Sequence, residues 1–457
     1  MPNTINNNAN YPEISQSNAW YERAREVIPA GTQTLAKGSG QFVRGVAPAY
    51  LARGKGARVW DVDGNEYLDF SMAVGPLSLG YCDQDVDEAI RRQLEDGISF
   101  SLVHPLEVEV AELVRQTVPA AEMVRFSKTG AEATSAAVRL ARAYTGRSKV
   151  LCCGYHGWHD WFISVTDRDR GVPRAVADLT YTFEYNDLES VTAAFDDEVA
   201  CVILEPVTFV KPRQGFLQGL RKLCTERGAL LIFDEMWTGF RIALGGAEQY
   251  FGVSPDLACF SKAVANGMPL SLLTGRREFM QLLEREVFFF TTFGGETLSL
   301  AAAKAAIAKL QRERVPEHIA SLGTKIHQGL TELVQKLDMP YVKSVGLPYR
   351  TMMSFDGEYG NPLQMKSLLQ QELIRRGLLW NGFHNLCLAH GERDIDYLLG
   401  AYAEALPVLR EAVNEHSVTE MIKGQSIEPV FRKTHKFNSK PRVDPHPDRS
   451  VIRLSAR

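Results

Sequence analysis

The chain has 457 residues, of which 45% are hydrophobic, so it is long enough to bury more than one compact layer around sizeable cores. Its formal net charge of −4, with both signs abundant, offers no basic field for nucleic acid, and no apolar run approaches the roughly 20 residues that a membrane span needs. We therefore expect a globular protein that acts on small molecules and binds neither nucleic acid nor membrane.

The start of the chain and its cysteines indicate the compartment. Residues 1–18 are polar and rich in asparagine, and they lack the charged start and apolar centre of a signal peptide. The seven cysteines are scattered, and Cys152, Cys201 and Cys259 lie inside apolar runs, where cysteine usually behaves as a small buried hydrophobe. These features predict a cytoplasmic protein without a disulfide framework.

The first expected structured element is a β-hairpin over residues 54–70, where two apolar stretches flank a turn at Asp63–Gly64. We assign residues 1–85 to an N-terminal segment that contributes to a small domain. From about residue 86, helical stretches alternate with short apolar runs, at 123–126, 149–153, 200–206, 229–235 and 257–262. Runs without polar alternation suit strands that are covered on both faces in a mostly parallel sheet, so residues 86–315 are expected to form a large α/β domain.

The last third of the chain changes character. Helical periodicity begins at about residue 301, and the shorter mixed elements that follow predict a second, smaller domain over 316–424. Residues 425–457 are rich in Pro, Lys, Arg and His and have little apolar periodicity, which predicts a basic surface arm or tail without chemistry of its own.

Three polar residues lie at the ends of successive apolar runs. The apolar run in VILEP stops at Glu205, that in LLIFDE stops at Asp234, and ACFSK ends on Lys262. Ligands of open parallel sheets bind at the carboxyl ends of the strands, so two carboxylates and an amine are expected to face one crevice. Taken singly, a strand-end aspartate is more often a helix cap and a lone lysine is usually solvated; the regular order of the three favours a functional site.

Residues 123–146 predict an anion site. They read as a strand, a turn of small residues at Thr129, Gly130 and Ala131, and a helix that Gly146 ends. The backbone N–H groups of the turn and the helix dipole favour a negative charge, so a phosphate is expected there. A plain capped turn is the alternative, and it would be preferred if no other feature pointed to this edge of the sheet.

The segment Tyr155 to His159 follows the run at 149–153. An aromatic ring at such a position can lie on the face of a planar heterocycle, and the neighbouring Gly157 leaves room for that ring. His156 and His159 also suggest a metal pair, but no further ligand residue has suitable spacing nearby, and we expect no metal.

In this order, the segments resemble the motifs of the fold-type I, class III aminotransferases, most closely the branch that contains glutamate-semialdehyde aminomutase. The resemblance extends from about Phe42 to about Leu409 and is carried by VWDVDGNEYLDF, GPLSLGY, VRFSKTGAEATSAAVRLARAYTGRSKV, GYHGWHD, LEPV, IFDEMWTGFR and SKAVANGMP. Each motif is weak alone, but together in register they are specific. The resemblance implies an α/β fold with a large domain on a mostly parallel seven-stranded sheet, a smaller α+β domain formed by the N- and C-terminal segments, and pyridoxal 5′-phosphate as cofactor.

The resemblance also implies a role for each matching residue. Lys262 would form a Schiff base with the cofactor's aldehyde and then move the proton between substrate and cofactor, Asp234 would pair with the pyridinium nitrogen, and Tyr155 would stack on the ring. The implied cofactor-binding residues are Thr129, Gly130, Ala131, Tyr155, His156, Glu205, Asp234, Met236, Lys262 and Thr297. Among them, Thr297 would reach the phosphate of a neighbouring subunit's cofactor, which predicts a homodimer with shared active sites.

The segments that would meet the substrate depart from the aminomutase. Ala73 and Val74 replace its serine and tryptophan, residues 208–215 carry two basic residues and no acid, and His384 with Asn385 lies where the aminomutase has a glutamate. Arg44 matches an arginine of the aminomutase's substrate region and is a candidate for bidentate carboxylate recognition, with a solvated surface arginine as an even alternative. The candidate substrate-binding residues are Arg44, Val74, His384 and Asn385.

The leading functional hypothesis is a ping-pong aminotransferase, which moves an amino group from an amino donor to a carbonyl acceptor. A polar pocket around His384 and Asn385 would suit a hydroxylated keto or aldehyde acceptor such as a sugar. An intramolecular aminomutase and a pyridoxal-phosphate-dependent epimerase are the alternatives. A non-catalytic relative is disfavoured, because a scaffold has no need for a buried lysine opposite a carboxylate. The sequence leaves the donor, the acceptor and the stereochemistry open.

Overall fold

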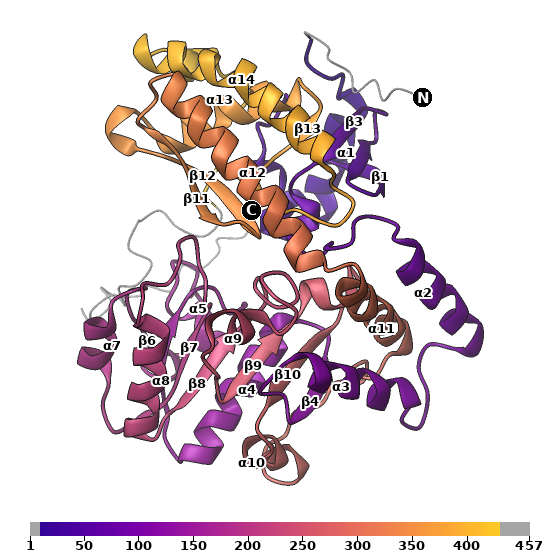
Figure 1. The fold of residues 1–457 in the computed structure, drawn as a ribbon, viewed down its shortest axis with the longest axis vertical. Coiled ribbons are helices and arrows are strands. Elements are labelled where there is room, and N and C mark those ends of the chain that lie inside the picture. Colours follow the sequence, from indigo (N-terminus) through magenta and orange to yellow (C-terminus); the bar gives the residue numbers. More distant parts are fainter. Residues whose placement is uncertain (1–9, 430–457) are drawn as a thin grey trace, which may run out of the picture.

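The computed structural model describes residues 10–429, which form two lobes (Figure 1). The larger lobe is built on a seven-stranded sheet with helices around it, and the smaller lobe combines the N-terminal strands with the C-terminal helices. Within the described residues, no helix is both long and apolar enough to cross a membrane.

The large sheet has the strand order β4-β10-β9-β8-β7-β5-β6. Its strands are β4 (Met123–Ser127), β5 (Lys149–Cys153), β6 (Thr180–Thr182), β7 (Val199–Leu204), β8 (Leu230–Asp234), β9 (Leu257–Phe260) and β10 (Ser271–Gly275). Only β10 runs against the others, since it pairs antiparallel with both β9 and β4. The prediction of a mostly parallel seven-stranded sheet is confirmed.

Both faces of this sheet are covered, which explains the continuous apolar runs. Along β8, Leu231 and Phe233 belong to one hydrophobic cluster, and Leu230 and Ile232 belong to another on the opposite face. The first cluster includes residues of α8 (Phe216–Arg227), and the second includes residues of α4 (Gly130–Thr145). The carboxyl ends of the central strands are therefore the part of the sheet left for a ligand.

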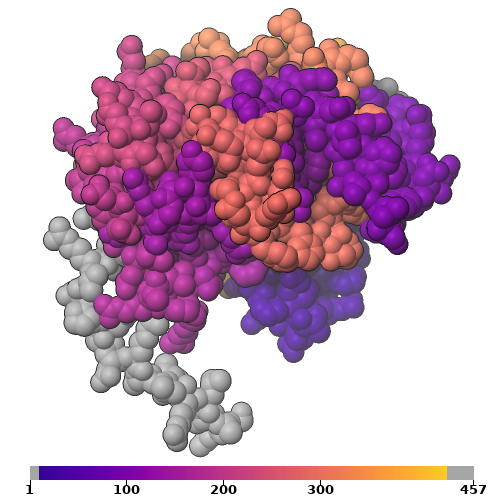
Figure 2. All heavy atoms as spheres, turned by 90° about the horizontal axis from the view of Figure 1, so that it is seen from below, coloured from indigo at the N-terminus to yellow at the C-terminus, as the bar shows by residue number. Residues whose placement is uncertain are grey.

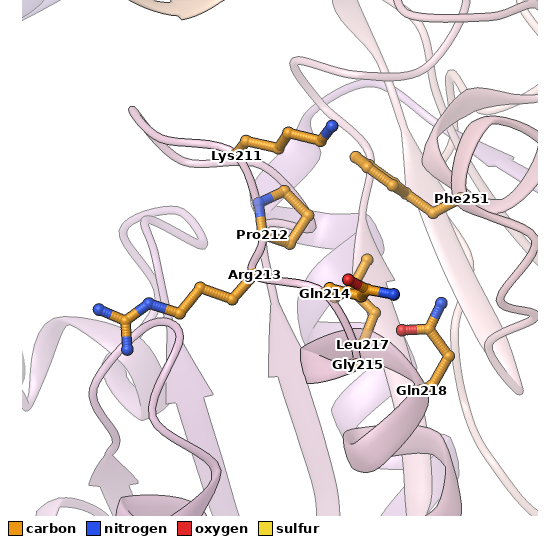
Figure 3. Close-up of a pocket in the computed structure, with 8 residues that line it drawn as sticks. All are labelled: Lys211, Pro212, Arg213, Gln214, Gly215, Leu217, Gln218 and Phe251. Carbon is orange, nitrogen blue, oxygen red and sulfur yellow. The ribbon is translucent and has the colours of Figure 1, made fainter.

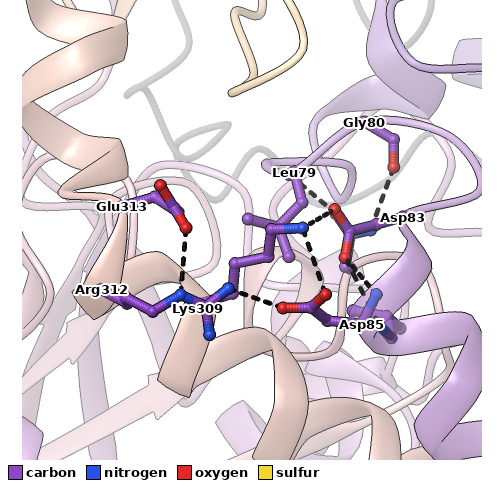
Figure 4. Close-up of polar contacts among 9 residues, drawn as sticks. Leu79, Gly80, Asp83, Asp85, Lys309, Arg312 and Glu313 are labelled. Atoms are coloured by element: carbon purple, nitrogen blue, oxygen red, sulfur yellow. Dashed lines mark hydrogen bonds and ion pairs between the residues drawn. The ribbon is translucent and has the colours of Figure 1, made fainter.

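The helix α2 (Gln84–Asp96) lies against α11 (Thr297–Arg312), and ion pairs join the two (Figure 4). Asp83 caps α2 by accepting hydrogen bonds from the N–H groups of Asp85 and Val86, and its other oxygen accepts one from Lys309 Nζ at 2.8 Å. Arg312 donates to Asp85 at 2.6 Å. These contacts fix α11, which leads from the large lobe into the small one.

The small lobe contains two sheets and takes strands from both ends of the chain. The first has the order β1 (Leu51–Lys55), β2 (Arg58–Asp61), β3 (Glu66–Asp69) and β13 (Leu378–Leu379), and the second has β11 (Val342–Leu347), β12 (Arg350–Phe355) and β14 (Phe383–His384). The hairpin expected over 54–70 is confirmed, because β2 and β3 pair antiparallel around the Asp63–Gly64 turn. The parallel pairing of β3 with β13 joins the N-terminal segment to the C-terminal one.

Long helices cover these sheets: α12 (Val315–Lys336), α13 (Pro362–Ile374) and α14 (Glu392–Asn414). The expected domain boundary, between residues 315 and 316, falls at the first residue of α12. The remaining helices are α1 (Ser15–Val27), α3 (Pro105–Thr117), α5 (Asp160–Ile163), α6 (Arg174–Ala177), α7 (Leu188–Ala194), α9 (Gly246–Phe251), α10 (Arg277–Met280) and α15 (Val418–Met421). Of the tail expected over 425–457, residues 425–429 lie along the small lobe, where Gln425 bridges Arg44, and residues 430–457 lie outside the described residues.

Candidate active site

The three strand-end residues lie side by side at one edge of the large sheet. Asp234 is the last residue of β8, Glu205 follows β7 directly, and Lys262 stands two residues after β9. Because β7, β8 and β9 are adjacent and parallel, the structure brings the two carboxylates and the amine together as the sequence predicts.

Lys262 has the properties of an amine that is neutral near neutral pH. Burial, reinforced by the positive charge of Arg350, lowers the pKa of Lys262 to about 7. Its Nζ lies 3.5 Å from the centroid of the Trp237 ring. A neutral lysine amine is the form that attacks an aldehyde, so the site presents a nucleophile.

Asp234 is paired with a buried histidine behind the strand ends. Nδ1 of His156 lies 2.8 Å from Asp234 Oδ2, and Nε2 of the same ring lies 3.1 Å from the backbone oxygen of Cys153. The histidine therefore orients the carboxylate from behind, and the second oxygen of Asp234 accepts a hydrogen bond from the backbone N–H of Met236 at 3.1 Å.

Glu205 is held against the segment that carries Tyr155. Its Oε1 accepts a hydrogen bond from the backbone N–H of Tyr155 at 2.6 Å. Burial and the nearby charge of Asp234 raise the pKa of Glu205. The Tyr155 ring is 40% exposed on the site side and meets Phe162 edge-on, which leaves its surface accessible to a ligand.

The expected anion site is the N-terminus of α4. Thr129 and Glu132 form a capping box, in which the Thr129 hydroxyl accepts from the Glu132 N–H at 3.3 Å and the Glu132 carboxylate accepts from the Thr129 N–H at 2.8 Å. The cap leaves the N–H groups of Gly130 and Ala131 as the outward donors of the helix. Side chains would close this space: a Cβ on Gly130 would lie 2.8 Å from Met236 Sδ, and one on Gly157 would lie 2.5 Å from Ala131 Cβ.

These groups fit pyridoxal 5′-phosphate. A neutral lysine suits its aldehyde, an aspartate oriented by a buried histidine suits its protonated ring nitrogen, and the N–H groups at the start of α4 suit its phosphate. In the part of the chain that the structure describes, no group of three His, Cys, Asp or Glu residues is placed to hold a metal ion.

Arg350 is a site residue that sequence reasoning missed. It opens β12, yet its guanidinium carbon lies 3.6 Å from the Trp237 ring centroid, beside the lysine. Its charge contributes to the low pKa of Lys262 and lowers that of Glu205, which shows how near it lies to both. The one signal in the sequence is an arginine at the start of the otherwise uncharged run RTMMSF.

Val74 lines a cavity of about 210 Å³ between the N-terminal segment and the small lobe. Met72, Ala73 and Val74 have φ angles of 43°, 53° and 69°, a left-handed stretch that non-glycine residues adopt at a cost. The next residue, Gly75, lies against Trp237, since a Cβ there would fall 2.3 Å from a ring carbon. The cavity therefore borders the aromatic residue that contacts Lys262.

The structure does not place Arg44 in this cavity. Its guanidinium donates to the Tyr21 hydroxyl at 2.9 Å, and its backbone bridges Gln425. The cation among the lining residues is Lys37, which sits with Ser71 and Asn381. Arg44 was expected to meet the substrate because it matches an arginine of the aminomutase's substrate region. In the structure, the cation of the N-terminal segment that lines the cavity is Lys37.

His384 and Asn385, which the sequence suggested as substrate contacts, are buried and contact internal partners. His384 is fully buried, its two ring nitrogens lie 2.8 Å from the Thr351 hydroxyl and 2.9 Å from the Tyr402 hydroxyl, and burial lowers its pKa to about 3. Asn385 is buried as well and donates to the backbone oxygen of Ser71 at 3.0 Å. Both residues hold the small lobe together.

Thr297 is the first residue of α11, its side chain is fully buried, and its hydroxyl donates to the backbone oxygens of Gly97 and Ile98 at 2.9 and 3.0 Å. Its contact with the cofactor phosphate of a neighbouring subunit stays a prediction. The exposed threonine of this region is Thr292, on the loop that precedes α11.

A second cavity, of about 420 Å³, lies at residues 211–218 with Phe251 (Figure 3). Lys211 and Phe251 point toward each other, whereas the side chain of Arg213 points away from the group. None of the strand-end residues lines this cavity, so we do not assign it to the site.

A strand-end lysine, a carboxylate–imidazole pair and an anion-binding helix terminus, set in this fold, define an enzyme that uses pyridoxal 5′-phosphate. Residues 42–388 match the family model of the class-III aminotransferases, and the chain belongs to this family. The recognition made from the sequence motifs is thereby confirmed, as are the fold type and the cofactor.

Relatives in this family have different reactions. The chain is 35% identical over 412 residues to a 3-aminobutyryl-CoA aminotransferase of Cloacimonas acidaminovorans, an alignment that covers 87% of this chain and 98% of the relative. It is 35% identical over 430 residues to a glutamate-1-semialdehyde 2,1-aminomutase of an Exiguobacterium species, with the same coverage of 87% and 98%.

Solved structures agree on the fold. The pyridoxal-phosphate-bound FumI protein of a Sphingopyxis species matches with a TM-score of 0.81 and 27% identity, covering 87% of this chain and 97% of that one. An omega-transaminase from Sphaerobacter thermophilus matches with a TM-score of 0.79 and 28% identity, covering 87% and 98%.

Proposed function

We propose that this chain catalyses transamination, moving an amino group from an amino donor to a carbonyl acceptor in two half-reactions. The observation that carries the proposal is Lys262, an amine with a pKa of about 7 beside Asp234 and Glu205. The bound cofactor supplies an aldehyde that links to amines and a ring that accepts electrons from the carbon next to the amine.

The chain's own residues have distinct tasks in this proposal. Lys262 would hold the aldehyde covalently, and its amine, once released, would move a proton to and from the substrate carbon. Asp234, with His156 behind it, would keep a proton on the ring nitrogen. The N–H groups of Gly130 and Ala131 would hold the phosphate, with Tyr155 and Met236 beside the ring.

The test is a single-turnover experiment with the cofactor-loaded enzyme. We expect at least one amino acid or amine to convert the absorbance of the lysine-bound cofactor to that of its amino form, and a carbonyl compound to restore it. Failure of every donor in a broad panel would reject transamination. Lys262→Ala should lose the lysine-bound absorbance, and full activity in that variant would overturn the mechanism.

An intramolecular aminomutase is the second candidate, because aminomutases are among the relatives that are 35% identical. It differs in needing no second substrate, so turnover of one amino aldehyde without any added carbonyl acceptor would favour it. A hydroxylated acceptor such as a sugar stays part of our proposal. His384 and Asn385 are internal, so the groups that would bind its hydroxyls are Ser71 and Asn381, in the otherwise mostly apolar lining of the 210 Å³ cavity.

We also propose that two copies form a homodimer. Exposed apolar side chains gather on the loop before α11 and on the adjoining segment before α3, namely Ile98, Phe100, Leu102, Val103, Phe288, Phe290 and Phe293. The two segments meet, because the N–H of Thr297 donates to the oxygen of Ile98 at 3.0 Å. Figure 2 shows this face, where the α11 loop lies among residues of the first third of the chain. Exposed apolar side chains gathered in this way are typical of a protein–protein interaction surface.

A further inference from the structure

Arg350 is a buried cation that feels the charge of Glu205 but forms no ion pair with it. Its residue surface is only 8% exposed, and among residues 10–429 no carboxylate forms an ion pair with it. Its Nε is buried and has no hydrogen-bond partner in the described part of the chain. A charge in this setting costs folding free energy, so a role outside the fold's own stability must account for it.

A comparison with Arg241 shows what a structural arginine looks like in the same lobe contact. Arg241 is fully buried too, but its guanidinium donates to the Ser78 hydroxyl at 2.8 Å and to the backbone oxygens of Leu386 and Tyr349 at 3.1 and 3.4 Å. The terminal nitrogens of Arg241 are therefore bonded within the chain, although its Nε, like that of Arg350, has no partner among the described residues. The Arg350 guanidinium makes no side-chain hydrogen bond within residues 10–429, and Arg350 is 8% exposed where Arg241 is fully buried.

Aromatic rings hold the Arg350 guanidinium in place and leave its edge available. Its central carbon lies 3.6 Å from the Trp237 centroid and 4.3 Å from that of Phe383. Stacking on aromatic faces orients the planar group without occupying its N–H donors, which lie in the plane.

The same Trp237 ring also contacts the reactive lysine. Lys262 Nζ lies 3.5 Å from the Trp237 centroid, and the guanidinium carbon of Arg350 lies 3.6 Å from the same point. The distance between the two cations is therefore at most the sum of these two distances. At such a separation, a carboxylate one or more carbons from the substrate's amino carbon would come into the neighbourhood of the guanidinium.

We propose that Arg350 recognises the carboxylate of the amine substrate through a bidentate contact and so sets the enzyme's preference for amino acids over simple amines. This inference rests on the proposed transamination. A carboxylate is the group that matches the planar fork of an arginine. It would also give Arg350 the ion-pair partner that it lacks among residues 10–429. Arg350 thereby takes the role that the sequence suggested for Arg44.

The experiment compares amines that differ only by a methyl group in place of the carboxylate. The pairs are L-alanine with 2-aminopropane, 3-aminobutanoate with 2-aminobutane, and 4-aminobutanoate with 1-aminobutane. For at least one pair we expect the wild-type holoenzyme to react about 10²-fold faster at limiting substrate with the carboxylate form. A wild-type enzyme that reacts equally well with both members of every reactive pair would overturn the proposal.

Variants of Arg350 then assign the preference. Arg350→Met keeps a long apolar stem but removes the charge, and we expect it to reduce the preference to within about tenfold through a higher KM for the carboxylate member. Arg350→Lys keeps the charge without the fork and should restore part of the preference. Arg393→Met, which removes an exposed arginine of α14, is the matched control and should behave as wild type.

Two readouts separate this role from a structural one. Removing an unpaired buried charge should leave the melting temperature of Arg350→Met unchanged or raised, whereas a structural arginine would lower it. In addition, loss of the nearby positive charge should raise the pH at which the lysine-bound cofactor changes its absorbance. A destabilised variant with an unaltered substrate preference would contradict the inference.

The inference also has a test that does not need turnover. The unreactive carboxylates 2-methylpropanoate, 3-methylbutanoate and pentanoate replace the amino group of each substrate by methyl. Titrated against the holoenzyme, at least one should bind, and Arg350→Met should weaken that binding at least tenfold while Arg393→Met does not. If no amine reacts but this binding holds, transamination fails and the carboxylate site stands; if amines react but no carboxylate binds, the reverse is true.

Discussion

At the scale of single residues, the site depends on holding Lys262 neutral. Burial and the charge of Arg350 bring its pKa from the ordinary value of 10.5 to about 7. Between these two pH values the unfolded chain binds a proton that the folded chain does not, so the free energy of unfolding rises with pH in this window. Below the window, both states are protonated and the folded state carries the full cost of a buried ammonium.

We therefore predict that Lys262→Ala raises the melting temperature of the cofactor-free protein by a few degrees at pH 7 and below. The gain should shrink as the pH approaches 10.5, where lysine is neutral in both states. Differential scanning calorimetry over a pH series measures this, with Lys343→Ala, an exposed lysine of β11, as control. A gain that grew with pH would contradict this assignment of the charge.

His156 is expected to matter although it lies behind the carboxylate. In His156→Leu, Asp234 loses the hydrogen-bond partner that orients it, so we predict a fall in kcat of about 10- to 100-fold with little change in KM, as for other buried orienting partners. Steady-state kinetics measure the split between kcat and KM. His159→Leu, in the same segment, is the control, and an equal loss in both variants would point to a general disturbance of the loop.

At the scale of elements, the anion site depends on how closely the segment 154–159 approaches the start of α4. Gly157 has a φ of 104°, and a Cβ there would lie 2.8 Å from the Ala131 Cα, part of a helix backbone that cannot retreat. Gly171 has a similar φ of 98° but nothing within 4 Å of such a Cβ.

This pair of glycines gives a matched test. Gly171→Ala should cost only the left-handed backbone strain, about 1–2 kcal/mol. Gly157→Ala should cost clearly more and should also weaken cofactor retention, because the displaced helix terminus carries the phosphate donors. Thermal unfolding and cofactor release on dialysis measure the two effects; equal losses in both variants would remove the crowding argument.

Elements of the large lobe could be predicted from the sequence because each apolar run of the central strands is buried on both faces, as along β8. The positions of Lys262, Asp234 and Glu205 followed, since parallel neighbours end at one edge. Arg350 and Lys37 could not be found in this way, because they come from segments that meet the site only after the two lobes pack together. The burial of His384 and Thr297 likewise depends on distant partners, Tyr402 and Gly97.

At the scale of the whole molecule, the exposed apolar patch before α3 and α11 is the feature that a second copy would cover. We predict a dimer in solution and expect Phe290→Lys to shift it toward monomer, because Phe290 is 61% exposed in the middle of the patch segment. Light scattering after size exclusion measures the mass. Tyr250→Lys, 49% exposed on α9, is the control, and a monomeric wild type would exclude the dimer.

The two lobes carry different parts of the enzyme's chemistry. Lys262, Asp234 and the start of α4 belong to the large lobe, whereas Arg350 belongs to a strand of the small lobe, and Arg241 fixes the backbone just before it through the Tyr349 oxygen. Reactivity and selectivity are therefore encoded in separate stretches of the chain. A family built in this way can acquire new substrates by changes in the small lobe while its catalytic apparatus is inherited intact, and an engineer can follow the same route by varying β12 alone.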